Sequence, residues 1–294
     1  MKRLYLILFC FLIVAQVSAQ ENKKRKPNAA YNKQNDANEK FLNKQWWLGF
    51  KAGTNLTDVH VTKTYSVFSP TNYSPDQSAK KYEHFKQPGA QATIEASFYF
   101  KKFYFSLQPT YQHSLFTYTN SYLWYDDVVP TNNLELNYEQ EQKLDYFIIP
   151  LLIKYDIAGN KLRPYVQIGA FSAFLINANK QTTISGTDNA SGGENNFTDP
   201  AIIVGAKDLF AKSSWGLIGG AGLNYTLGNV RLNLDAQYKL GMSNITSTKN
   251  RNSSDSLSGV GDILDDMTMD NISISIGCLF PMRFLANGFK SSDR

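Results

Sequence analysis

The sequence predicts an all-β protein, an eight-stranded antiparallel transmembrane β-barrel of the up-and-down type. Three observations lead to this fold class. The N-terminus has the pattern of an export signal, the rest of the chain alternates apolar and polar residues with a period of two, and tight turns alternate with long connections. A period of two is the side-chain repeat of a β-strand, and a closed barrel is the β architecture that satisfies its backbone groups in lipid.

Residues 1–19 have the parts of a secretory signal peptide. Two basic residues follow the initiating methionine, residues 4–14 are apolar, and residues 17–19 place Val-Ser-Ala before the expected cleavage point. A membrane-anchoring helix is the alternative, but such a helix needs about 20 apolar residues and this run is shorter. The sequence therefore predicts export through a cleaved signal peptide, with Gln20 at the mature N-terminus.

The predicted mature chain divides into a leader, a barrel and a tail. Residues 20–44 are polar and contain the basic run Lys-Lys-Arg-Lys at 23–26, which is typical of a disordered, solvated segment. We expect the barrel over residues 45–283 and a short polar tail over residues 284–294, with leader and tail in the periplasm. Cys278 is the only cysteine left after signal cleavage, so no intramolecular disulfide can form.

The strand pattern is cleanest at residues 230–240. Apolar residues from Val230 to Leu240 alternate with polar residues from Arg231 to Lys239, over about the length of a tilted spanning strand. The fourth and fifth expected strands are apolar on both faces, so their facing stays open. The eight expected strands are residues 46–56, 90–100, 103–112, 144–155, 164–176, 215–227, 230–240 and 272–282.

The connections between these strands alternate in length. Three are short and have the length or residues of tight turns, and four run to roughly 20 residues or more. Short periplasmic turns and long extracellular loops are typical of outer-membrane barrels. The short links are residues 101–102, 158–161 and 228–229, and the long ones lie near 58–87, 118–138, 178–213 and 244–269.

Alternation alone does not say which face of the barrel is inside. A soluble, lipocalin-like barrel would point its apolar face inward around a ligand. Here the polar face carries strand-centred charges of both signs and many glycines, and aromatic residues gather at strand ends, as in interfacial girdles. We therefore expect the apolar face to contact outer-membrane lipid and the bore to be closed by its own polar side chains, which argues against a general diffusion porin. The expected interior polar network, with a structural role, is Lys51, Glu95, Arg231, Asp235 and Lys239.

Three segments resemble a known family. Residues 49–56 (GFKAGTNL), 146–155 (YFIIPLLIKY) and 164–170 (PYVQIGA) are similar to the Bacteroidetes outer membrane β-barrel domain family, often labelled porin family or PorT-like. The resemblance covers about residues 46–282. It implies an outer-membrane barrel, whereas the part that PorT takes in type IX secretion is tied to no motif in this chain.

The last expected strand, residues 275–282, resembles the terminal signal that the barrel-assembly machinery recognises. Gly277 and Phe280 match the pattern of polar residue, glycine and then apolar or aromatic residues. The strand departs from that pattern because it ends in Met282 and a tail follows. The resemblance implies the assembly machinery as a partner during biogenesis.

No residue pattern predicts catalysis, a cofactor or a metal site. His113 and Ser114 are adjacent, so on a strand they point to opposite faces and are poorly placed as base and nucleophile. The aspartates of residues 255–270 could collect calcium, but they lack the spacing of an EF-hand loop. The formal net charge of +5 is too mild to indicate nucleic-acid binding.

The predicted function is therefore a non-enzymatic outer-membrane barrel that presents long extracellular loops for binding, adhesion or envelope integrity. The alternative is an accessory component of a secretion or envelope-assembly machine that docks through the leader or the loops, and a rim enzyme that uses His113 is the least favoured hypothesis. Aromatic residues of the loops can either pack the loops together or contact an envelope protein or a glycan. The candidate contact residues are Tyr122, Trp124 and Tyr125.

Overall fold

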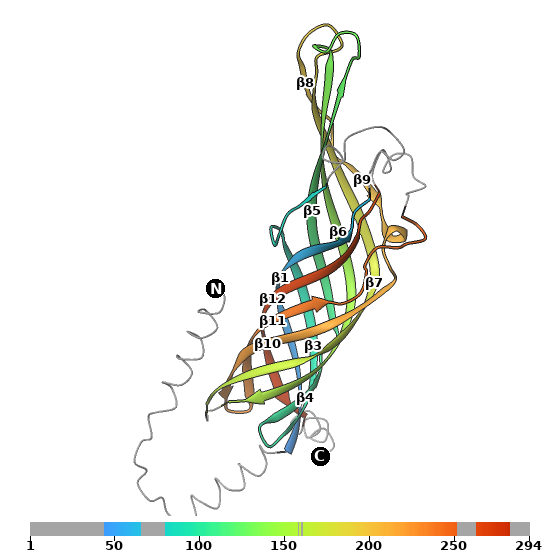
Figure 1. Cartoon of the computed structure of the whole chain (residues 1–294). Helices are drawn as coiled ribbons and strands as arrows, with labels where there is room; N and C mark the ends of the chain where they lie inside the picture. Colours follow the sequence, from blue (N-terminus) through green and yellow to red (C-terminus); the bar gives the residue numbers. More distant parts are fainter. Residues whose placement is uncertain (1–43, 66–79, 158, 160, 252–262, 283–294) are drawn as a thin grey trace, which may run out of the picture.

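The structure, a computed structural model, describes residues 44–65, 80–157, 159, 161–251 and 263–282. The expected signal peptide, nearly all of the leader, and the tail lie outside this part of the chain. The described residues form one antiparallel sheet that closes on itself (Figure 1). β12 pairs with both β11 and β1, so the first and last strands of the ring meet.

Eight strands make up this ring, in the order of the chain. β4 and β5 act as one interrupted strand, because both lie between β3 and β6. The ring confirms the predicted eight-stranded antiparallel barrel. Its members are β1 (Lys44–Lys63), β3 (Pro88–Phe100), β4 (Phe103–Leu107) with β5 (Thr110–Tyr125), β6 (Asn133–Asp156), β7 (Leu162–Asp188), β10 (Ser213–Leu227), β11 (Val230–Gly241) and β12 (Asp266–Pro281).

The short connections gather at one end of the barrel, called here the turn end, and the opposite end is the loop end. Lys101 and Lys102 join β3 to β4 with φ angles of 47° and 75°, the left-handed values that a two-residue type I′ hairpin needs at both positions. Gly228, at φ 57°, makes the turn between β10 and β11. Four short elements lie toward the loop end: β2 (Lys81–Tyr82), β8 (Asn195–Thr198), β9 (Ile202–Gly205) and the 3₁₀ helix η1 (Lys207–Leu209).

Polar side chains point into the bore and apolar side chains point out. Along β11 the pattern is complete: Arg231 and Asp235 are fully buried, whereas Leu232 and Leu234 are exposed on the outer surface. The barrel is therefore inverted relative to a soluble one, as the sequence predicts. The two strands with open facing follow the same geometry, with Tyr146 of β6 buried inside and Leu151 exposed outside.

One predicted strand is interrupted. Residues 103–112 were expected to be continuous, but β4 ends at Leu107 and β5 begins at Thr110. Pro109 has no amide hydrogen, so it cannot donate to either neighbouring strand. Its carbonyl still accepts from the Ile94 amide at 2.9 Å, and this bond holds the broken strand in the ring.

Three ring strands extend more than ten residues beyond their expected bounds, and β1 and β12 are extended by fewer. β5 continues to Tyr125, β6 begins at Asn133 and β7 runs to Asp188, so much of two predicted loops, near 118–138 and 178–213, is strand. The outward-facing residues of β6 change from apolar to charged at Asp145, which is near the edge of the apolar band. Beyond it, the upper parts of β5, β6 and β7 join β8 in a sheet that rises from the loop end (Figure 1). This protruding sheet comprises residues 119–125, 133–142, 179–188 and 195–198.

Candidate functional site

The turn-end half of the bore contains a buried network of ion pairs. Lys51 Nζ lies 2.9 Å from a carboxylate oxygen of Glu95 and 2.7 Å from one of Asp235. Lys154 Nζ lies 2.7 Å from the other oxygen of Glu95. These four side chains come from β1, β3, β6 and β11, so the network crosses the bore and links strands that are not neighbours. The expected residues Lys51, Glu95 and Asp235 thus meet in one cluster.

Lys154 is a member that sequence reasoning missed. It lies on a segment that is apolar on both faces, so its facing could not be read from alternation. Its charge could have identified its facing, because a lysine directly after the apolar residues 147–153 has to point away from lipid.

The other two expected residues lie above and below this cluster. Lys239 donates to the side-chain oxygens of Gln112 at 2.6 Å and Gln91 at 3.2 Å. Arg231 donates to the Tyr104 hydroxyl at 2.8 Å, and its guanidinium lies 3.8 Å from the centre of the Trp47 ring. A cation over an indole face is favourable, and more so away from water. The expected polar residues therefore lie in one bore but in three separate sets of contacts.

The loop-end half of the bore differs from the expectation, because apolar residues close it. Two segments, 206–211 and 244–247, fold against the inward face of the wall and are called here the inner plug. They bond to each other from the Ala211 amide to the Ile245 carbonyl at 2.8 Å. Phe210 packs edge-on against Phe116 of the wall, with ring centres 6.5 Å apart. The plug residues join one apolar core with wall residues that include Leu144, Tyr146, Ile148, Phe171 and Ile218.

Two of the aspartates near 255–270 pair with basic side chains. Asp265 pairs with Lys80 at 3.0 Å and accepts from the Tyr82 hydroxyl at 2.8 Å. Asp266 pairs with Arg251 at 2.6 Å. Within the described ranges, no group of three or more His, Cys, Asp or Glu side chains is arranged to hold a metal ion. Asp255 and Asp262 lie outside the described residues.

The histidines are bound to carboxylates on the outer surface. His113 Nδ1 lies 2.7 Å from Asp145, while Ser114 is buried on the inner side of the wall. Base and nucleophile thus point to opposite sides of the barrel wall and cannot act together. His60 contacts Asp270 at 3.1 Å, and His84 contacts Asp58 at 2.7 Å.

The protruding sheet carries the three aromatic residues that the sequence placed in a loop. Tyr122, Trp124 and Tyr125 lie on β5, not in a connection, because the hairpin to β6 is only residues 126–132. The side chains of Trp124 and Tyr125 are exposed, and Val128 at the hairpin tip is 86% exposed. Asp126 closes the tip by accepting from the Val128 and Val129 amides at 2.8 and 3.1 Å. These amides hold the pKa of the Asp126 carboxyl below its usual value.

One comparison decides the family. The model of a family described as "Outer membrane protein beta-barrel domain" matches residues 18–247. The chain belongs to this family. In such outer-membrane barrels, short turns face the periplasm and long connections face outward. The turn end is therefore the periplasmic end, and the protruding sheet is extracellular. No helix in the described ranges has the length and apolar character that crossing a membrane requires.

Several solved structures have a similar fold. Neisserial surface protein A (NspA) is 12% identical, with 80% of this chain and 96% of that chain covered and a TM-score of 0.32. AlkL, solved in lipid bilayers, is 14% identical, with 89% and 96% covered and a TM-score of 0.34. Ail of Yersinia pestis is 10% identical, with 80% and 99% covered and a TM-score of 0.27. No curated protein sequence matches this outer-membrane barrel.

The two residues of the expected assembly signal have different surroundings in this outer-membrane barrel. Phe280 points outward and is partly exposed on the lipid-facing surface. Gly277 faces the bore, where an added Cβ would collide with the Phe50 carbonyl and lie 2.5 Å from Lys51 Cγ. A side chain at position 277 would therefore displace Lys51 from its ion pairs. Recognition of these residues by the assembly machinery stays a prediction.

Proposed function

We propose that this protein is a surface-binding barrel of the outer membrane, non-enzymatic, whose contact surface is the protruding sheet. The observation that carries the proposal is that three ring strands continue beyond the apolar band, and that the end of β5 and its hairpin to β6 carry exposed aromatic and aliphatic side chains. From Thr119 to Tyr125, β5 adds about 20 Å beyond the barrel at the usual rise per residue. A closed barrel does not need this extension, so the extension has another use.

The composition of the tip fits contact with a partner at the cell surface. Trp124, Tyr125 and Val129 are partly exposed and Val128 almost fully so, although apolar side chains normally avoid water. Aromatic residues are enriched in contact surfaces because they bury a large area at a low cost in conformational entropy. The partner is an envelope protein or a glycan, since indole and phenol rings pack against both.

The bore supports the same proposal because buried side chains of the described residues occupy both of its halves. Ion pairs fill its periplasmic half and the apolar core with the inner plug fills its outer half. A role in transport through the bore is therefore disfavoured relative to a role at the surface.

The test compares cells that display the wild-type barrel with cells that display the variant Trp124→Ser, Tyr125→Ser. We expect the variant to lose at least ten-fold in binding to an immobilised panel of surface glycans and envelope proteins. Ile203→Ser is the matched control, because Ile203 is an exposed apolar residue of β9, which pairs with the base of the protruding sheet at Gln181 and not with its tip. Equal binding by the wild type and the tip variant, at equal surface amounts, would overturn the proposal.

An accessory role in a secretion or assembly machine is the alternative, with the basic leader or the loops docking a partner. Apart from Lys44, where β1 begins, that leader lies outside the described residues. A further variant that lacks residues 20–43 tests docking through the leader, because that form of the accessory role needs residues 20–43 and not the sheet tip for partner capture.

A further inference from the structure

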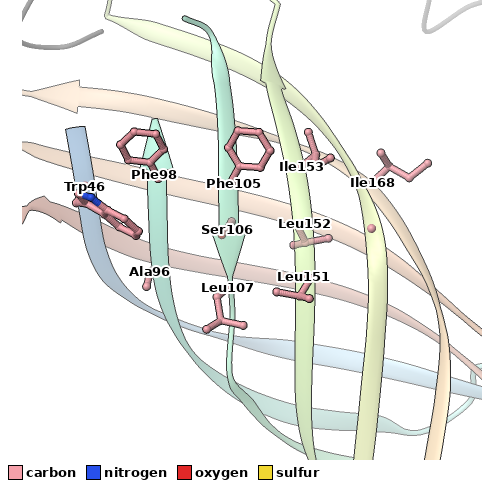
Figure 2. A pocket seen from close by; sticks show the side chains of 11 residues that line it. Trp46, Ala96, Phe98, Phe105, Ser106, Leu107, Leu151, Leu152, Ile153 and Ile168 are labelled. Atoms are coloured by element: carbon pink, nitrogen blue, oxygen red, sulfur yellow. The ribbon is translucent and has the colours of Figure 1, made fainter. Parts of the chain in front are cut away.

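The outer surface of the barrel has an apolar groove near its periplasmic end. The groove has a volume of about 590 Å³ and crosses β1, β3, β4, β6 and β7 (Figure 2). Trp46, Phe98 and Phe105 stand around its end nearest the turn, while Leu107 and Leu151 line the far end. Phe105 and Leu151 are among the exposed hydrophobic residues of the barrel, so the groove opens to lipid and not to the bore.

Ala96 makes this groove deep. It faces outward between Leu48 of β1 and Leu107 of β4, where it pairs with both residues. Its methyl group leaves space that the larger side chains around it do not fill. The groove also lies beside the break after Leu107, where β4 ends and the regular surface of the ladder is interrupted. A flat, fully packed lipid-facing wall would have no such hollow.

Cationic side chains lie just beyond the periplasmic end of the groove. Phe98 pairs with Phe105, and three residues further along each strand the hairpin turns at Lys101 and Lys102. Both lysines are exposed, and Lys101 Nζ lies 5.2 Å from the ring centre of Phe100, an outward-facing residue. Three residues of strand correspond to about 10 Å, so the lysines lie about one headgroup length from the groove.

We propose that the groove is a binding site for one phospholipid of the periplasmic leaflet. One acyl chain lies in the groove over Ala96, and the phosphate is held by Lys101 and Lys102 at the hairpin. The apolar lining selects a hydrocarbon chain, the two ammonium groups select an anionic headgroup, and the position at the turn end selects the inner leaflet. The site is independent of the protruding sheet, so it stands or falls separately from the proposed function.

The test uses the refolded full barrel in vesicles that contain phosphatidylglycerol with a photoactivatable diazirine on one acyl chain. We expect crosslinks to concentrate on groove residues such as Phe105 and Leu151, and Ala96→Phe to reduce them at least five-fold by filling the groove. Ala92→Phe is the matched control, since Ala92 also faces outward on β3 but lies outside the groove. Crosslinks that are spread evenly over the outer surface, or that survive Ala96→Phe, would overturn the proposal.

A second variant tests the headgroup contact without altering the groove. Lys101→Asn with Lys102→Asn removes both charges, and asparagine tolerates the left-handed backbone of this turn. We expect groove crosslinks from phosphatidylglycerol to fall at least three-fold, while the shift in gel mobility of the folded barrel stays as in the wild type. Unchanged crosslinks in this variant would refute the part assigned to the lysines.

Discussion

Lys51 of β1 and Glu95 of β3 form an ion pair 2.9 Å long inside the bore, with both side chains almost completely buried. Glu95 also pairs with Lys154, so one carboxylate serves two lysines. Removal of one partner from a buried pair leaves an uncompensated charge, which costs far more than the pair itself contributes. The stability of the barrel is therefore sensitive to this glutamate.

Glu95→Gln is expected to lower the free energy of unfolding by about 3–5 kcal/mol, because Lys154 loses its ion pair and Lys51 keeps only Asp235. Urea unfolding of the barrel in detergent micelles measures the change. Glu135→Gln is the control, since Glu135 is exposed on the protruding sheet and the change should stay within about 0.5 kcal/mol. Equal effects from both variants would contradict the network.

Phe210→Ala tests the inner plug. Phe210 is buried against Phe116, and truncation of a buried phenylalanine costs about 3–5 kcal/mol. The same urea titration measures the loss, with Val128→Ala as an exposed control. We also expect no sustained conductance of the wild-type barrel in planar bilayers. A steady current through the wild type would show that the described contacts do not close the bore.

Gly277→Ala and Phe280→Ala separate a packing role from a recognition role. An added methyl at position 277 collides with the Phe50 carbonyl and with Lys51. The free energy of unfolding of Gly277→Ala, refolded in detergent without any helper protein, should therefore be about 1–3 kcal/mol lower. Phe280→Ala removes an outward ring and should refold normally, but its assembly in cells should fall if the ring belongs to the assembly signal. Normal assembly of Phe280→Ala in cells would argue against that signal.

Cys278 reports which face of β12 meets lipid. It lies opposite Phe50 on β1 and Leu232 on β11, both exposed on the outer surface. In vesicles, an apolar maleimide should label Cys278, whereas a charged maleimide should not. The control is Ser275→Cys in a Cys278→Ser background, because position 275 faces the packed bore and should react with neither reagent until unfolding. Rapid labelling of Cys278 by the charged reagent would place it outside the bilayer.

Asp126 gives the tip of the protruding sheet a pH dependence. The Val128 and Val129 amides hold the pKa of its carboxyl below the usual value. A carboxyl with a lowered pKa stabilises the folded turn at pH values above about 4, and the stabilisation is lost as the pH falls through the lowered pKa. Hydrogen exchange at these two amides should lose protection only in that acidic range. In Asp126→Asn, which keeps an acceptor oxygen but cannot ionise, protection should not change with pH.

The ring of strands could be predicted from sequence where polar and apolar residues alternate strictly. Where they do not alternate, the facing of the strands could not be predicted. In β11, each charge had an apolar neighbour on either side, so strand, length and facing followed from the pattern alone. In β6, both faces are apolar because both sides of the wall are apolar there. Tyr146 packs in the outer half of the bore, and Leu151 faces lipid. An alternating pattern shows the facing of a strand only where the two sides of the wall differ in polarity. It does not show the facing where the bore is apolar, as it is at the loop end.

The plug and the protruding sheet were unpredictable for a related reason. Leu209 and Phe210 lie in a connection, and their burial depends on packing against Phe116, a contact between distant parts of the chain. The upper parts of β5, β6 and β7 are polar on the outward face and read as loops, because their stability comes from pairing with each other rather than from burial. Such pairing leaves little trace in a single sequence.

The length of β5, β6 and β7 separates two tasks within the same strands. Closure of the ring is complete below Thr119, so residues 126–132 and 189–194 at the tips can change, or accept an inserted epitope, without touching a single wall contact. Residues at the tips can therefore vary in a way that escapes antibodies, while selection for insertion into the membrane acts on the residues of the wall. The same division makes the two tips natural positions for displaying a foreign peptide on the cell surface.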